Sequence, residues 1–119
     1  MKTPKELKNE YKLLKFRMGV FQIRNLDNGK LYVDKATNLD SIFNRHRMQL
    51  NHGNHPNEAL QADWKALGED HFKYEVLGEI EQKDGANIDY ARELKTLEQL
   101  WLEELKPFGE KGYNHPPRN

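Results

Sequence analysis

One acidic residue, Glu98, lies within an apolar helix face near the end of the sequence. At about 100° per residue, Leu94, Leu97 and Trp101 share one face of a helix. Glu98 lies about 40° from Leu94, inside this apolar stripe. A buried carboxylate is costly unless a cation, a metal ion or hydrogen-bond donors satisfy it. Glu98 is therefore a candidate metal ligand, and the alternative is a salt-bridged glutamate at the margin of the stripe.

A histidine stands in a similar setting earlier in the sequence. Leu39, Phe43 and Leu50 form an apolar helix face, and His46 lies on it. Histidine titrates near neutrality, so His46 could be a general base or a phosphate contact. The alternative is a structural histidine whose ring is satisfied by neighbours.

Basic residues surround His46 in the sequence, with Arg45 and Arg47 beside it and Lys35 and Arg24 before it. Guanidinium groups hold phosphate through paired hydrogen bonds. Arg24, Lys35 and Arg47 are therefore predicted to contact nucleic acid. The alternative is a solvated basic surface.

His52 and His55 have a spacing of three residues, which a metal ion could use. Gly53 between them should end a helix, and no cysteine or regularly spaced third ligand accompanies them. This pattern favours a loop with polar side chains over a metal site.

Composition limits the remaining possibilities. The 119 residues suit one small domain, and the lack of cysteine excludes disulfides and thiolate metal sites. No apolar run approaches transmembrane length, which leads us to expect a soluble, cytoplasmic protein without membrane partners. Residues 1–55 hold eleven Lys and Arg against five Asp and Glu, whereas residues 56–119 hold eight against fourteen. The basic half could mark a polyanion site. Equally, folding could interleave the two halves into a mixed surface.

The elements that would position these residues can be read from periodicity and turn chemistry. Two β-branched and aromatic runs, 20–24 and 30–34, flank a segment ending in Asn28-Gly29, which predicts a hairpin. A third strand is expected over 71–80. Expected helices cover 3–16, a stretch from Thr37 or Asn38 to about 51, 57–67, and a stretch from Asn87 or Asp89 to about 105. Residues 81–86 are expected to form a loop, and residues 107–119 an irregular tail.

This order predicts an α+β sandwich, in which a small three-stranded antiparallel sheet is flanked by helices. We expect a helical extension over 1–17, a domain over 18–115 and a tail over 116–119.

Taken together, these segments resemble the GIY-YIG nuclease superfamily, which is named for two motifs on its first two strands. Gly19-Val20-Phe21 stands where GIY would stand, and Tyr32-Val33-Asp34 stands where YIG would stand. The middle segment Gly53-Asn54-His55-Pro56-Asn57 and the closing Gly112-Tyr113-Asn114 are also similar to members. The resemblance runs from about residue 19 to residue 114.

The resemblance implies metal-dependent cleavage of phosphodiesters, with DNA as the expected nucleic-acid partner. A single Mg²⁺ or Mn²⁺ would be held by Glu98, and Tyr32 would help to activate the attacking water. His46 would assist one turn after an arginine that stabilises charge on the phosphate, and Asn114 would support the site.

Three positions depart from the family pattern. Phe21 replaces the first tyrosine, Asp34 replaces the second glycine, and Ile42 replaces the catalytic arginine. Loss of one such electrostatic contact costs on the order of 10²–10³ in rate. We therefore expect an endonuclease-like domain with weakened or lost cleavage that still binds nucleic acid.

Two alternatives remain open. In one, the domain is an active single-metal endonuclease that uses Tyr32, Glu98 and a relocated Arg45, or one in which Asp34 instead adds a metal ligand beside Glu98. In the other, it is a non-catalytic domain that binds a protein partner and needs no metal ion.

Overall fold

The computed structural model describes residues 16–82 and 88–116. Apart from Phe16, the helix expected over 3–16 lies outside the described residues. Most of the loop expected over 81–86 lies outside them as well.

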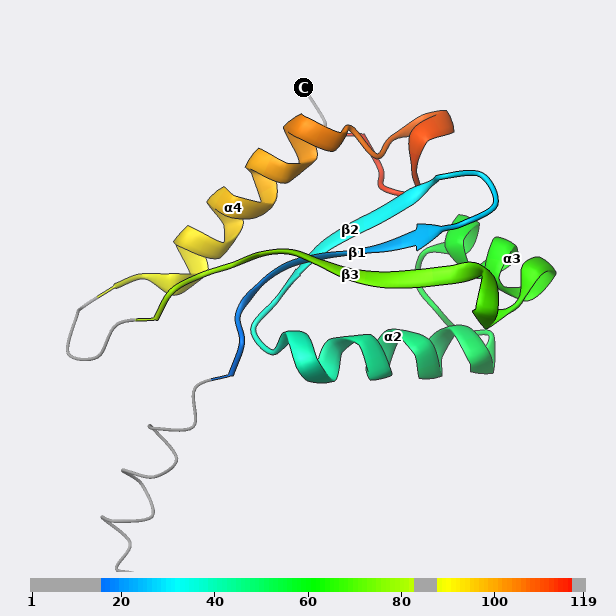
Figure 1. Ribbon diagram of the computed structural model, residues 1–119, viewed down its shortest axis with the longest axis horizontal. Coiled ribbons are helices and arrows are strands. Elements are labelled where there is room, and N and C mark those ends of the chain that lie inside the picture. Colours follow the sequence, from blue (N-terminus) through cyan, green and yellow to red (C-terminus); the bar gives the residue numbers. More distant parts are fainter. Residues whose placement is uncertain (1–15, 83–87, 117–119) are drawn as a thin grey trace, which may run out of the picture.

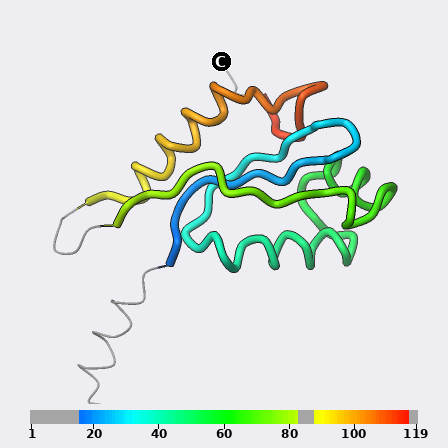
Figure 2. The backbone as a smooth tube through the Cα atoms, viewed as in Figure 1, coloured from blue at the N-terminus to red at the C-terminus, as the bar shows by residue number. Residues whose placement is uncertain are grey.

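The centre of the domain is a three-stranded antiparallel sheet with the strand order β2-β1-β3 (Figures 1 and 2). The strands are β1 (Gly19–Asn25), β2 (Leu31–Ala36) and β3 (Phe72–Glu79). The predicted hairpin joins β1 and β2. Gly29 adopts the left-handed backbone (φ 77°) that the turn requires, and its N–H donates to the carbonyl of Asn25. Since β1 is central, β2 and β3 are the edge strands of the sheet in the described part of the chain, and neither pairs with a further strand there.

Gly19, the first residue of the first short motif, is required by a close approach of β1 and β3. A Cβ at this position would lie 2.0 Å from the carbonyl oxygen of Gly78. The pairing of β1 with β3 also shifts register between Val20 and Phe21. No residue with a side chain fits at Gly19 without moving the backbone.

Helices cover both faces of the sheet, with α2 and α3 on one face and α4 on the other (Figure 1). The helices are α2 (Leu39–His52), α3 (Glu58–Leu67) and α4 (Tyr90–Leu105). The side chains of Asn38, Asn57 and Asp89 each cap one helix by accepting a backbone N–H. These bounds agree with the predicted elements to within a few residues.

Two apolar cores result from the alternation of side chains along β1. Phe21 and Ile23 pack with buried residues of α2 and α3. Val20 packs on the other face with Val33 of β2 and Leu94 of α4. The second core fixes the distance between β2 and α4, the two elements that carry Tyr32 and Glu98.

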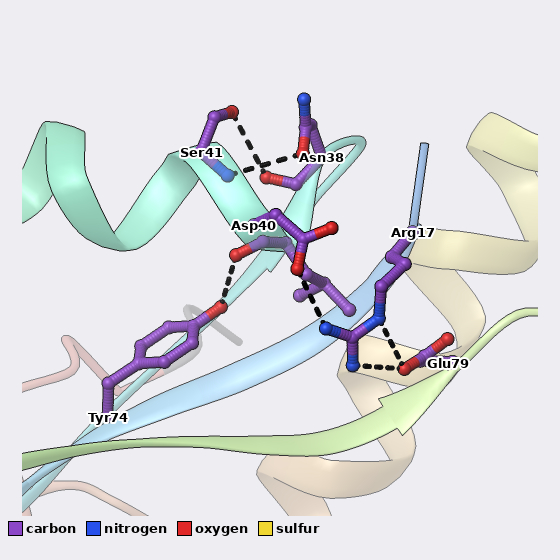
Figure 3. Close-up of polar contacts among 7 residues, drawn as sticks. Arg17, Asn38, Asp40, Ser41, Tyr74 and Glu79 are labelled. Carbon is purple, nitrogen blue, oxygen red and sulfur yellow. Dashed lines mark hydrogen bonds and ion pairs between the residues drawn. The ribbon is translucent and has the colours of Figure 1, made fainter. Parts of the chain in front are cut away.

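The start of α2 is tied to the sheet by polar contacts around Arg17 (Figure 3). The Arg17 guanidinium donates to Asp40 at 2.8 Å and also to Glu79 of β3. The Tyr74 hydroxyl donates to the carbonyl oxygen of Leu39 at 2.8 Å. These contacts hold the helix that carries Ile42, Arg45 and His46 in a fixed position on the sheet.

The expectation of an irregular tail is wrong for residues 107–114. A short 3₁₀ turn covers Gly109–Lys111, and a parallel bridge pairs Gly112 with Leu31. A Cβ on Gly112 would lie 2.3 Å from the carbonyl oxygen of Pro107, so only glycine fits there. The segment therefore lies along the free edge of β2. Among the described residues, no helix is long and apolar enough to cross a bilayer.

Candidate active site

A cleft of about 490 Å³ lies where β2, α4 and the C-terminal segment meet. Its walls include Tyr32 and Asp34 of β2, Glu98 of α4, and Asn114. Residues separated by up to 82 positions in the sequence therefore converge on one place. Tyr32, Glu98 and Asn114 are predicted catalytic or metal-binding residues, and Asp34 is one of the three altered family positions.

Glu98 occupies the inner face of α4, as its helical periodicity predicted. Its side chain is only 16% exposed, and Lys35 Nζ lies 3.2 Å from its Oε1. Burial raises the pKa of the Glu98 carboxyl. The hydrogen bond and charge of Lys35 lower the same pKa, whereas the charge and hydrogen bond of Asp34 raise it. Two carboxyl groups thus line this part of the cleft, and one ammonium contacts it from outside the lining.

Tyr32 and Asp34 point the same way from β2, as residues two apart in a strand do. The Tyr32 hydroxyl donates to Asp34 Oδ2 at 3.3 Å. Burial raises the pKa of the Tyr32 phenol, and the charge and hydrogen bond of Asp34 raise it further. The resting phenol is therefore protonated at neutral pH, and its oxygen keeps lone pairs that can accept a hydrogen bond from water.

His46 forms a buried pair with His55, which the sequence interpretation had assigned to a polar loop. The two side chains are 7% and 5% exposed, and His46 Nδ1 lies 2.7 Å from His55 Nε2. His52 remains exposed, so the spacing of His52 and His55 has no structural counterpart. His55 lies in the expected loop between α2 and α3, but this connection turns its ring inward, which the sequence did not predict.

Hydrogen bonds assign a tautomer to each ring of this pair. The backbone N–H of Asn57 donates to His55 Nδ1 at 3.0 Å, so His55 carries its proton on Nε2. That proton is donated to His46 Nδ1, which leaves the proton of neutral His46 on Nε2. Burial, then the neighbouring His55, lowers the pKa of His46 to about 4. Neutral His46 is thus a hydrogen-bond donor at Nε2.

The His46 ring also connects the pair to the cleft. Its centroid lies 5.6 Å from that of Tyr32 in an edge-on arrangement, and 5.4 Å from that of Phe21. Phe21 is fully buried, so the altered residue of the first motif serves as packing beneath the histidine.

Asn114 contacts the protein backbone with both ends of its amide. Its Oδ1 accepts from the Val33 N–H at 2.9 Å, and its Nδ2 donates to the Val33 carbonyl at 2.7 Å. The side chain thereby pairs with the free edge of β2 between Tyr32 and Asp34. Asn114 positions these two residues through the strand that carries them.

The neighbouring Tyr113 ties the same segment to the opposite face. Its hydroxyl donates to Asp63 of α3 at 2.7 Å and accepts from the buried Asn25 amide at 3.0 Å. The cleft wall is therefore fixed to β1 and α3 as well as to β2.

The remaining predicted residues lie outside the cleft lining. Ile42 is half-buried and packs against the core beneath α2, whereas Arg45 is exposed and its charge lowers the pKa of His46. Arg24 pairs with Glu75 at 2.7 Å, and Arg47 lies 3.6 Å from Glu69. Of the three basic residues predicted to contact nucleic acid, Lys35 contacts a residue of the cleft.

The chemistry of the cleft suits a single hard cation. Within the described ranges, no group of three or more His, Asp or Glu side chains converges. Two carboxylates in an open cleft match the way Mg²⁺ is often held, by one or two carboxylates with water and phosphate oxygens completing its shell. Asp34 and Glu98 are the residues that would hold such an ion.

The domain thus combines a small antiparallel sheet between helices with tyrosine, glutamate and asparagine side chains around one cleft. Residues 17–114 match the family described as the GIY-YIG catalytic domain, and the chain belongs to this family. The resemblance inferred from the short motifs, and the fold it implied, are confirmed.

Individual proteins that resemble the chain agree with this family assignment. It is 30% identical over 89 residues to intron-associated endonuclease 1 of Enterobacteria phage T4. That match covers 75% of the chain but 33% of the relative, so the chain spans about a third of the relative's length. Two structures of the I-TevI catalytic domain, one a mutant, superpose with TM-scores of 0.69 at 27% and 28% identity. These matches cover 83% and 84% of the chain, and 93% and 99% of those domains.

Proposed function

We propose that this domain binds DNA over the cleft and cleaves phosphodiesters there slowly, with a divalent ion held by Glu98 and Asp34. The observation that carries the proposal is the convergence of Tyr32, Glu98 and Asn114 on one cleft beside His46. Similarity to a phage intron endonuclease and to the I-TevI catalytic domain supports DNA as the substrate class.

Each residue of the cleft has a role that its contacts suit. A bound ion would supply positive charge to the phosphate and acidify a water molecule. Tyr32 can accept a hydrogen bond from the attacking water because its own proton is directed to Asp34. His46 can donate its Nε2 proton to a phosphate oxygen or to the Tyr32 oxygen, and His55 holds the ring in the required tautomer.

Slow cleavage follows from Ile42. An isoleucine cannot stabilise the charge that develops on phosphate, and loss of one such contact costs on the order of 10²–10³ in rate. Arg45 lies three residues further along α2, which turns it about 60° away, and it is exposed. Arg45 is the residue that would replace part of the missing electrostatic contact to the phosphate.

The test is incubation of the full chain with supercoiled plasmid, single-stranded DNA and branched DNA, in Mg²⁺ and in Mn²⁺, beside Glu98→Ala. We expect slow nicking that Glu98→Ala abolishes, together with salt-dependent DNA binding. Binding without cleavage would leave a DNA-binding domain and remove the catalytic part of the proposal. Absence of both would overturn it and favour a protein-interaction domain.

A further inference from the structure

The ammonium of Lys35 sits against the carboxylate that the proposed function assigns to the metal ion. Lys35 Nζ lies 3.2 Å from Glu98 Oε1, and the Glu98 side chain is 16% exposed whereas that of Lys35 is 43% exposed. The buried partner is therefore fixed by α4, and the exposed partner has room to move. A lysine stem with four rotatable carbons can swing its charge several ångströms without disturbing the strand.

Asp34 adds a second carboxylate to the same place. Its Oδ2 accepts from Tyr32 and its Oδ1 accepts from the Lys35 backbone N–H at 2.8 Å. The two acidic groups and one ammonium leave this part of the cleft with one net negative charge. An entering divalent ion would compete for the carboxylate that the ammonium contacts, and it would be repelled by the ammonium at close range.

We propose that Lys35 is a resident competitor for the divalent ion, holding Glu98 in the metal-free protein and leaving it before the ion binds. The inference rests on the proposed function in taking Glu98 as the metal ligand. The displaced Lys35 ammonium could then bind a DNA phosphate at the cleft. Binding of the metal ion and binding of DNA would therefore be coupled. Phosphate and metal ion would then favour each other's binding.

The test measures the affinity of the full chain for Mn²⁺ in the absence of DNA. The electron paramagnetic resonance signal of the free ion reports how much Mn²⁺ remains unbound. Lys35→Met removes the charge and keeps most of the stem. Lys73→Met is the matched control, because Lys73 is an exposed strand lysine whose charge acts on Glu75 rather than on Glu98. We expect Lys35→Met to bind Mn²⁺ on the order of tenfold more tightly than the unaltered chain, with Lys73→Met unchanged.

A second variant tests whether Glu98 binds the ion. The tighter binding should disappear in Lys35→Met/Glu98→Gln, and circular dichroism should show that every variant is folded. Equal affinity of the unaltered chain and Lys35→Met overturns the inference. Failure of Lys35→Met to bind Mn²⁺ also overturns it, since removal of the competitor should free the two carboxylates. A positive result alongside absent DNA cleavage would leave the inference standing and count against the catalytic function alone.

Discussion

Restoring an arginine with Ile42→Arg should raise DNA cleavage on the order of 10²–10³-fold, which is the range for one lost electrostatic contact to developing charge. Residue 42 lies one helical turn before His46, and the His46 ring lies 5.6 Å from Tyr32 of the cleft. A guanidinium extending from position 42 can therefore reach a phosphate held between Tyr32 and Glu98.

The Ile42→Arg substitution should lower the free energy of unfolding only slightly. Ile42 is half-buried against the core, and full burial of such a side chain is worth about 1.5–3 kcal/mol. Losing half of this contact, while the arginine stem covers part of the same surface, should cost about 1 kcal/mol of unfolding free energy. Urea unfolding would measure that loss directly.

The assay is the initial rate of plasmid nicking in Mn²⁺, at equal fractions of DNA bound. Asn44→Arg is the matched control, since it adds the same charge to an exposed position of α2 two residues away. Ile42→Arg/Glu98→Ala should be inactive. A folded Ile42→Arg variant that cleaves no faster than Asn44→Arg would refute the argument that Ile42 limits the rate.

Three further results are expected. Because burial lowers the pKa of His46 to about 4, the unfolded chain binds more protons than the folded one between about pH 4 and 6.5. The His46 contribution to stability should fall by about 2 kcal/mol as pH drops through that window. His46→Gln should weaken this pH dependence in urea unfolding, and the part due to His55, whose pKa burial also lowers, should remain. Asn114→Ala should cost about 2 kcal/mol by losing two hydrogen bonds to Val33, and a loss under about 0.5 kcal/mol in the same assay would contradict that assignment. Gly112→Ala should destabilise by about 2 kcal/mol or more, because its Cβ would lie 2.3 Å from the Pro107 carbonyl; an unchanged urea midpoint would disprove the close contact.

Local sequence signals predicted the elements well because their causes are local. The Asn28-Gly29 turn and the Asn38 cap act within a few residues, so the hairpin and α2 could be placed from the sequence. Glu98 could be assigned to a packed helix face for the same reason, since a helical period depends on neighbours along one element.

Contacts between different elements could not be predicted from these local signals. The contact between Lys35 and Glu98 joins residues 63 positions apart, and it depends on how α4 packs on β2. The pairing of His46 with His55 follows no helical or strand period, because it crosses the end of α2. The available signal was the short connection from Gly53 to the Asn57 cap, which forces the flanking residues together.

The bridge from Asn114 to the edge of β2 has a consequence for synthesis of the chain. Protein synthesis delivers Tyr32 and the rest of β2 to the solvent well before Asn114, and domains fold as their residues emerge. Until then, the Val33 backbone groups that Asn114 occupies are open, and such an edge is prone to pair with other strands. The cleft that Asn114 helps to line is therefore complete only after this residue has been synthesised.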